Sequence, residues 1–261
     1  MDLDLHGRHA LVCGASEGIG RATAHELALL GANVTVLSRR AEALQRVVDS
    51  LHAGDGQRHG LLAVDMADST AVGTQVAALA ARTPVHILVN NTGGPPGGPA
   101  HLAAASEYID AFERHLLSGQ ALLQAVLPGM RAAGWGRIVN VVSTSVREPI
   151  VGLGVSNTIR AAVAGWAKTL SRELGPDGIT VNNVLPGFTE TARIDQIIGN
   201  RARAEGRTDA EIADAMRAGV PARRFARPEE TGGVIAFLCS PAADYVNGVN
   251  LAVDGGRMAS I

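Results

Sequence analysis

The sequence predicts an α/β fold, in which a single Rossmann-type, doubly wound parallel sheet of about seven strands carries helices on both faces. The first observation is that short apolar runs alternate along the chain with longer helical patterns. The second is that these runs are nearly continuous in apolar residues, which is typical of parallel strands covered on both faces. The third is a content of 31 glycines against 3% aromatic residues, which favours close contact between helices and sheet.

The expected elements follow one another in this alternating order. Strands are expected at 9–14, 33–38, 60–64, 86–90, 137–142, 180–185 and 249–253. Helices are expected at 18–30, 41–51, 69–81, 106–133, 156–174 and 228–238. The stretch 191–218 also has a helical pattern, but it lacks a strand of its own. Because no linker, repeat or low-complexity segment divides the chain, we expect one domain over residues 1–261.

Composition excludes several classes of protein. Lys plus Arg is 23 and Asp plus Glu is 25, for a net charge of −2, which argues against a nucleic-acid or anionic-membrane binder. Two cysteines cannot form a disulfide framework, and a reducing compartment is the simpler interpretation. No apolar run approaches the roughly 20 residues of a membrane span, and the N-terminus is acidic, unlike a signal peptide. We expect a cytoplasmic protein with neither a nucleic-acid nor a membrane partner, and no metal site.

A glycine-rich turn joins the first expected strand to the first expected helix. Gly14, Gly18 and Gly20 stand in the order Gly-x3-Gly-x-Gly. Glycines at such a turn let the backbone approach a pyrophosphate, and the N-terminus of the following helix attracts the phosphate charge. The position between a strand and a helix is the context that this motif requires. The turn therefore predicts a dinucleotide site.

This spacing resembles the short-chain dehydrogenase/reductase family, and three later motifs agree with it. Asn90-Asn91-Thr92-Gly93 is similar to the family's Asn-Asn-Ala-Gly element. The segment 186–191 resembles its Pro-Gly-x-x-x-Thr element, and Asp254-Gly255-Gly256 its C-terminal Asp-Gly-Gly. The resemblance covers essentially the whole chain and is greatest to β-ketoacyl-carrier-protein reductase-like members. It implies that 191–218 is a substrate lid and that the protein is a homotetramer or a dimer.

The end of the second expected strand predicts the cofactor. An NAD site has an acid there for the ribose hydroxyls, whereas this chain has Ser38, Arg39 and Arg40. A guanidinium suits a 2′-phosphate, so we expect NADP(H), with Arg39 as the main contact. Glu17 is a counter-argument, because NADP-using relatives often have a base at that position. The alternative for Arg39 is a solvated residue at a helix start.

The resemblance also implies where the cofactor is contacted, with Asp65 and Met66 beside the adenine. The expected cofactor-binding residues are Gly14, Ser16, Glu17, Ile19, Ser38, Arg39, Arg40, Asp65, Met66, Asn91, Gly93, Arg160, Pro186, Gly187, Thr189 and Thr191.

The catalytic positions depart from the family pattern, in which a Tyr and a Lys four residues later act with a Ser and an Asn. Ser143 retains the family's Ser. Ser156 stands at the Tyr position and Arg160 at the Lys position, while His115 stands at the Asn position. The expected catalytic residues are therefore Ser143, Ser156, Arg160 and His115, and the tetrad is atypical.

Each replacement changes the available chemistry. The Ser156 hydroxyl is a far weaker acid than a phenol and is one ring shorter. Arg160 can hold ribose hydroxyls and stabilise an oxyanion, but it cannot titrate at neutral pH. His115 has an ordinary pKa near neutrality, so it is the candidate proton donor, directly or through a water. The alternative is that His115 only satisfies a helix bulge and its water. Ser143 can orient a substrate carbonyl or simply bond the backbone of its loop.

These observations predict an NADP(H)-dependent oxidoreductase that reduces a carbonyl (or imine) group of a small or acyl substrate, with non-standard proton delivery. The Gly/Pro loop 93–99 is expected at the rim of the substrate site. Charges within 191–218 balance at five arginines against five acids, so no basic docking site for an acyl carrier is expected there. Two alternatives stay open. One is a non-redox lyase, dehydratase or isomerase, in which Arg160 and Ser143 stabilise an enolate, and the other is a catalytically silent NADP-binding subunit.

Overall fold

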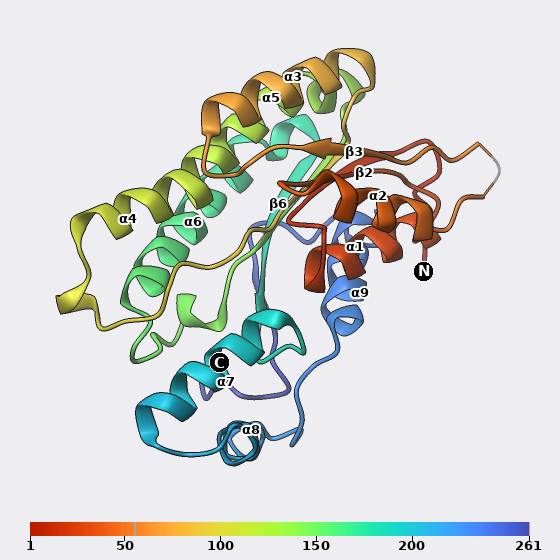
Figure 1. The fold of residues 1–261 in the computed structure, drawn as a ribbon. Coiled ribbons are helices and arrows are strands. Elements are labelled where there is room, and N and C mark those ends of the chain that lie inside the picture. The colour runs from red at the N-terminus through yellow and green to blue at the C-terminus, as the bar shows by residue number, and fades with distance from the viewer. Residues whose placement is uncertain (55, 261) are drawn as a thin grey trace.

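A computed structural model describes residues 1–54 and 56–260, and its centre is one parallel sheet (Figure 1). The strand order is β3-β2-β1-β4-β5-β6-β7. The strands are β1 (His9–Cys13), β2 (Asn33–Ser38), β3 (Gly60–Ala63), β4 (Ile87–Asn90), β5 (Gly136–Val141), β6 (Ile179–Pro186) and β7 (Asn250–Val253). The predicted doubly wound fold is confirmed, and the strand ends lie within one residue of the expected ones.

Helices cover both faces of the sheet. On one face lie α1 (Gly18–Leu29), α2 (Ala41–Ser50) and α9 (Pro228–Cys239), whose apolar side chains share a buried cluster. On the other lie α3 (Ser69–Arg82), α5 (Ser118–Ala133) and α6 (Gly154–Glu173), which form a second cluster (Figure 1). All residues of β1 and β5 are buried, as expected for strands covered on both sides. The edge strands β3 and β7 are only partly buried.

The sequence predicted a single helix over 106–133, and this is wrong in one respect. The segment consists of α4 (Ala105–Phe112), a five-residue π-helix η2 (Glu113–Leu117) and α5. A π-turn holds one more residue than an α-turn, so it shifts the side chains around it, and it is frequent at functional sites. His115 lies in the middle of this π-segment.

The expected helical stretch 191–218 is two helices. Gly206, at φ +64°, ends α7 (Ala192–Glu205), and Thr208 caps α8 (Asp209–Ala218). The pair has its own apolar cluster, in which Ile194 and Ile212 pack with Phe225. Figure 1 shows this lobe beyond the ends of the strands.

Short 3₁₀ turns complete the connections: η1 (Ala100–Leu102), η3 (Thr144–Val146), η4 (Gly175–Asp177) and η5 (Pro241–Ala243). Within residues 1–54 and 56–260, no helix has the length and apolar character needed to cross a bilayer. The expected domain range 1–261 includes Asp55 and Ile261, which lie outside the described residues, so it stays a prediction.

The strand order places the candidate site. The first three strands are added toward one edge of the sheet, and the chain then returns to the other side of β1, where β4 pairs with it in parallel. The order of strand addition therefore reverses between β1 and β4. Ligands of open α/β sheets bind at such a switch point, beyond the carboxyl ends of the strands. The loops after β1, β2, β4, β5 and β6 all end at this edge.

Candidate active site

The glycine-rich turn lies against the loop after β4. Gly14 has φ +59°, and a Cβ built on it would lie 2.7 Å from the Asn91 Nδ2. That Nδ2 donates to the backbone oxygens of Cys13 and Gly14, each at 3.3 Å. Asn91 therefore holds the turn in place at the switch point, and a side chain at position 14 would push the two loops apart.

The N-terminus of α1 is open toward the lobe of α7. Glu17 precedes the helix and makes no side-chain cap, so the first N–H groups of α1 keep their donor capacity. Gly18 has φ +57°, and its ideal Cβ would lie 3.0 Å from the Thr191 Cγ2. Thr191 therefore lies close against Gly18, beside the hydrogen-bond donors at the start of α1. A phosphate group suits such a helix N-terminus.

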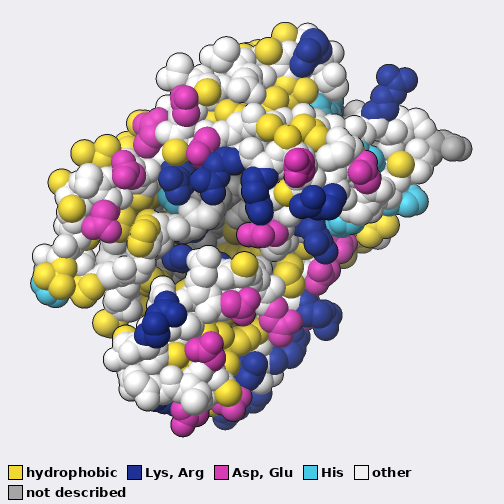
Figure 2. All heavy atoms as spheres, in the orientation of Figure 1, with side chains coloured by type: hydrophobic (Ala, Val, Ile, Leu, Met, Phe, Trp, Pro, Cys, Tyr) yellow, Lys and Arg dark blue, Asp and Glu magenta, His cyan; other side chains and the backbone are white. Residues whose placement is uncertain are grey.

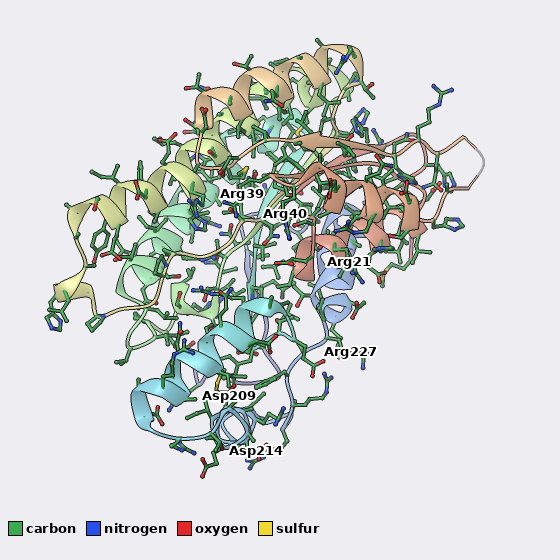
Figure 3. The ribbon with its side chains drawn as sticks, viewed as in Figure 1. Arg21, Arg39, Arg40, Asp209, Asp214 and Arg227 are labelled. Atoms are coloured by element: carbon green, nitrogen blue, oxygen red, sulfur yellow. The ribbon has the colours of Figure 1, made fainter. Side chains whose placement is uncertain are left out.

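Two arginines follow β2 at the same edge. The Arg39 Nη1 lies 3.8 Å from the Asp65 Oδ2, and the Arg40 Nη2 lies 3.6 Å from the Glu17 Oε2. All four side chains are well exposed, and such pairs contribute little to stability. Figure 3 labels both arginines, and they lie near each other at the end of β2. Both guanidiniums can therefore exchange these partners for an anionic ligand.

The backbone of Met66, which follows β3, is held by a hydrogen bond from α5. Its carbonyl oxygen accepts a hydrogen bond of 2.7 Å from the Ser118 Oγ at the start of α5, and its side chain is buried. The Ser38 Oγ, at the end of β2, is also buried and has no partner in the described part of the chain.

The segment after β6 returns to the glycine-rich turn. The Gly187 N donates to the Val253 oxygen at 2.9 Å, and a side chain at Gly187 would overlap Asp254. Thr191 follows as the N-cap residue of α7 and lies against Gly18. The predicted cofactor residues of the loops after β1, β2 and β6 thus line one edge of the sheet.

Ser143 and Ser156 occupy different settings. The Ser143 Oγ accepts a 3.1 Å hydrogen bond from the Ser145 N at the start of η3, which matches the backbone-bonding alternative. Its hydroxyl proton can still be donated elsewhere. Ser156 is the third residue of α6 and is 8% exposed.

The Gly/Pro loop after β4 is attached to the start of α6. The Gly98 N donates to the Gly152 oxygen at 2.7 Å, and the Gly154 N donates to the Gly98 oxygen at 3.0 Å. Gly154 has no room for a side chain against the backbone of Ala100. This attachment holds the expected rim, 93–99, beside the helix that carries Ser156 and Arg160.

Arg160 extends back toward the sheet. Its Nη1 donates to the Val141 oxygen at 2.8 Å, at the end of β5. Its Nε is buried and has no partner among the residues described. Burial, followed by the charge of Arg193, lowers the pKa of Arg160 to about 10. The guanidinium is therefore still a cation at neutral pH, in a setting that disfavours its charge.

His115 does not titrate near neutral pH as the sequence suggested. Burial, then the charges of Arg160 and Arg114, lower the pKa of His115 to about 3, although a hydrogen bond to the Gly93 backbone opposes this. Its Nε2 is buried and has no partner within the described residues. A neutral imidazole has one ring proton and one lone pair, and the tautomer with its proton on Nδ1 presents Nε2 as an acceptor. The imidazole is therefore neutral at pH 7.

A small cavity of about 20 Å³ joins these groups, and Asn90, Asn140, His115 and Arg160 line it. Three of its polar atoms are buried without a partner in the described chain: the Asn90 Oδ1, the His115 Nε2 and the Arg160 Nε. This volume accommodates one water molecule, which needs two to four polar partners. Two acceptors and one donor meet that requirement.

A ladder of asparagines, which sequence reasoning missed, reaches this cavity across four strands. The Asn90 Nδ2 donates to the Asn140 Oδ1 at 2.8 Å, the Asn140 Nδ2 to the Asn183 Oδ1 at 2.9 Å, and the Asn183 Nδ2 to the Asn250 Oδ1 at 2.8 Å. Every amide points the same way, so the Asn90 Oδ1 is the free acceptor at one end. The only available signal was an Asn in four apolar strands, and the strand order was needed to align them.

Arg193 was also missed as a site residue. It is the second residue of α7, and its Nη2 donates to the Pro95 oxygen in the rim loop at 2.8 Å. In the space-filling view, a hollow separates the sheet from the α7–α8 lobe, and Lys or Arg side chains gather along its edge (Figure 2). From the sequence alone, Arg193 is only one of the five arginines that balance five acids within 191–218.

A larger cavity of about 690 Å³ lies within the lobe, between α7, α8 and Phe225. Its polar lining includes Glu190, Asp195 and Asp209, and none of the predicted catalytic residues lines it. This cavity borders the candidate site through Thr191.

Comparisons with known proteins agree with this arrangement. The family model described as "Enoyl-(Acyl carrier protein) reductase" matches residues 14–257. The chain is 36% identical over 258 residues to the 3-oxoacyl-(acyl-carrier-protein) reductase FabG of Vibrio cholerae, covering 97% of this chain and 98% of the relative. It is 33% identical to the FabG of Pseudomonas aeruginosa, over 99% of this chain and 100% of the relative.

Solved structures are similar over nearly the full length. L-sorbose reductase from Gluconobacter frateurii, complexed with NADPH and L-sorbose, has a TM-score of 0.93 and 30% identity, with 100% of both chains covered. YwfH, an NADPH-dependent reductase involved in bacilysin biosynthesis, has a TM-score of 0.92 and 28% identity, covering 97% of this chain and 99% of that one.

Proposed function

This chain belongs to the short-chain dehydrogenase/reductase family, and from that membership we propose that it reduces a carbonyl (or imine) group of a small or acyl substrate through an atypical set of catalytic residues. It is an NADP(H)-dependent oxidoreductase, as are the similar reductases named with NADPH. The observation that supports the proposal most is that α6 brings Ser156 and Arg160 to the edge where the glycine-rich turn and Arg39 end.

The described residues fit NADP(H) on two counts. The uncapped N-terminus of α1 opposite Thr191 suits the pyrophosphate, and Arg39 with Arg40 suits the 2′-phosphate. We propose that the residues after β1, β2, β3, β4 and β6 named above hold the cofactor, with Arg160 at the ribose. When bound, NADPH supplies the hydride, and the protein supplies binding and orientation.

Substrate activation falls to the side chains near the cavity. We propose that Ser143 donates a hydrogen bond from its hydroxyl to the substrate oxygen and that Arg160 stabilises the negative charge that develops there. Ser156 is too short to take the place of a phenol, so it does not reach the substrate oxygen. Hydride transfer leaves an alkoxide on the substrate, and this alkoxide takes its proton from a water molecule whose hydroxide is neutralised by bulk solvent, so that no side chain of α6 supplies the proton.

His115 acts as a neutral partner in this proposal. A water in the small cavity donates to the Asn90 Oδ1 and the His115 Nε2 and accepts from the Arg160 Nε, which satisfies all three buried atoms. This water links the site to the π-segment. This role corresponds to the second alternative for His115, a residue that satisfies the helix bulge and its water, and it does not use His115 as the proton donor.

Association into a homotetramer or a dimer also remains a proposal. Ile109, Phe112 and Leu117 on α4 and the π-segment are exposed apolar side chains. A cluster of such side chains on one helix is typical of a subunit contact.

A titration with NADPH and with NADH, followed by nicotinamide fluorescence, tests this function. We expect wild type to bind NADPH more tightly than NADH. The measurement is repeated with the double variant Ser156→Tyr plus Arg160→Lys, which restores the family pair and is expected to gain reduction of plain ketones. Binding of neither nucleotide by wild type would contradict the cofactor and the function together.

A further inference from the structure

We propose that the substrate is a short oxo acid, a 2- or 3-oxo carboxylate, and that Arg193 binds its carboxylate beside Gly94 while Arg160 faces the reacting carbonyl. This inference rests on the proposed function, because it names the substrate class of the same site. It follows from the convergence of two guanidiniums at one glycine.

Gly94 brings the two guanidiniums together. A Cβ built on Gly94 would lie 3.4 Å from the Arg160 Nη2 and 3.6 Å from the Arg193 Nη2. Because Gly94 has no side chain, both guanidiniums can approach the backbone of the loop at this position. Arg160 comes from α6 and Arg193 from α7, so the lobe and a helix that covers the sheet each supply one cation at Gly94.

Neither cation has an acidic partner. No carboxylate of residues 1–54 and 56–260 lies within 4.0 Å of either guanidinium. On the same lobe, by contrast, Arg201 pairs with Glu205 and Arg217 with Asp214. Burial lowers the pKa of both Arg160 and Arg193, and Arg193 lowers that of Arg160 further. Like charges in partly buried positions are costly unless an anion joins them.

Arg193 has donor capacity left for that anion. Its one hydrogen bond to the described chain uses Nη2, and the rest of its planar fork is free to meet the two oxygens of a carboxylate. The large lobe cavity is less suited to an anion, because the three carboxylates of Glu190, Asp195 and Asp209 line it together with one guanidinium, Arg217, which is already paired with Asp214. The cofactor phosphates have their own donors at α1 and Arg39.

The distance between the two cations limits the length of the substrate. Because both end at Gly94, the carboxylate and the reacting carbonyl must be close to each other. A 2- or 3-oxo acid meets this condition, whereas an acyl chain with a remote charge does not.

The test compares oxo acids with their uncharged esters. NADPH oxidation at pH 7 is measured with 4-methyl-2-oxopentanoate, 3-oxobutanoate and the methyl ester of each. The unfolding temperature of the protein is measured with the same four compounds, both with saturating NADPH and without nucleotide. The variants are Arg193→Gln, which removes the charge, and Arg193→Lys, which keeps it. Arg201→Gln is the matched control on the same helix, since Arg201 already pairs with Glu205.

We expect kcat/KM for at least one acid to exceed that of its ester about tenfold to a hundredfold, which is typical of a charge-assisted contact. Arg193→Gln should abolish that preference, Arg193→Lys should keep part of it, and Arg201→Gln should leave it unchanged. NADPH affinity should be the same in all three variants.

Several outcomes would overturn the inference. Equal turnover of acid and ester would do so, as would a preference that survives Arg193→Gln. A fall in NADPH affinity in Arg193→Gln would assign Arg193 to the cofactor instead. If no compound is turned over, equal unfolding temperatures with acid and ester also reject the inference. Failure of wild type to bind NADPH rejects the proposed function, while the temperatures without nucleotide still decide whether a carboxylate binds.

Discussion

The Asn90 Nδ2 donates to the Asn140 Oδ1 at 2.8 Å, and this bond leaves the Asn90 Oδ1 as an acceptor in the wall of the cavity shared with His115 and Arg160. Asn140 in turn donates to Asn183, and Asn183 to Asn250. One amide cannot rotate unless its neighbours rotate with it. The ladder therefore fixes which atom of Asn90 faces the site, and hydrogen bonds in such a chain reinforce one another.

We predict that Asn140→Ala lowers both stability and turnover. Removing the middle of the ladder leaves two buried amide groups without partners, at a cost of about 1–3 kcal/mol in the free energy of unfolding. It also frees Asn90 to rotate, which should reduce kcat. Urea unfolding and NADPH oxidation are the measurements.

Asn182→Ala is the control for this prediction. Asn182 is buried on the neighbouring strand, and its Nδ2 donates to the Val246 oxygen at 2.8 Å, but it is not part of the ladder. It should lose similar stability while kcat stays unchanged. Equal losses of kcat in the two variants would mean that the ladder has no particular role in the site.

We predict a pH-dependent difference between wild type and His115→Asn. The folded state lowers the pKa of His115 to about 3, so between that value and its ordinary 6.5 the unfolded chain binds a proton that the folded chain does not. Wild type therefore loses stability as the pH falls through this window, and the Asn variant lacks this loss. The free energy of unfolding of the variant minus that of wild type should be about 1–2 kcal/mol larger at pH 5 than at pH 7.5.

Urea unfolding of both proteins at pH 5 and pH 7.5 measures this difference. His9, His25 and His86 also have lowered pKa values through burial, but they are present in both proteins, and their contributions cancel. A difference that does not vary with pH would show that His115 is as easily protonated in the folded state as in the unfolded one.

The fold could be predicted from the sequence because each buried strand is a continuous apolar run with turn residues at its ends. The π-helix at 113–117 could not be predicted from the sequence, since Glu-Arg-His-Leu-Leu contains no glycine or proline. A π-turn of this kind depends on tertiary packing against α6 and α3 rather than on local preference. The motifs assigned His115 and Arg160 to one site, and in the structure the two residues line one small cavity.

The missed residues have a common cause. Arg193 looked like any other charge of 191–218, and only folding separates it, because its neighbours Arg201 and Arg217 find partners on their own helices. The asparagine ladder needs the order β4-β5-β6-β7 and its register, which no single strand reveals. The pKa of His115 likewise depends first on its burial and then on the charges of Arg160 and Arg114, and the extent of that burial is set by the folded structure.

We predict that Arg137→Met destabilises the fold strongly although it lies far from the cofactor edge. Arg137 is 2% exposed, forms an ion pair with Asp244 and lies 4.1 Å from the ring centroid of Trp135. The substitution keeps the volume but removes the hydrogen bonds that Arg137 donates to the Gly136 and Gly178 oxygens and to Asp244, and it leaves Asp244 without its partner. Because Asp244 is largely exposed, leaving it unpaired costs little, and we expect the free energy of unfolding to fall by about 1–3 kcal/mol.

Thermal and urea unfolding check this value, with Asp244→Asn as the companion variant. Asp244→Asn should cost more than an exposed substitution normally does, because it leaves the buried guanidinium without a counter-charge. Unchanged stability in both variants would show that the ion pair contributes nothing.

We predict that Arg39→Ala changes the choice of nucleotide and little else. Arg39 has only a 3.8 Å contact with Asp65, so removing it should leave the free energy of unfolding within about 0.5 kcal/mol. A charge-assisted hydrogen bond to the 2′-phosphate should be lost, which weakens NADPH binding about tenfold to a hundredfold and leaves NADH binding unchanged. The control is Arg46→Ala, at an exposed position within α2, and it should alter the binding of neither NADPH nor NADH. Equal weakening for both nucleotides would place Arg39 on the adenosine rather than on its phosphate, and no weakening would transfer the 2′-phosphate contact to Arg40.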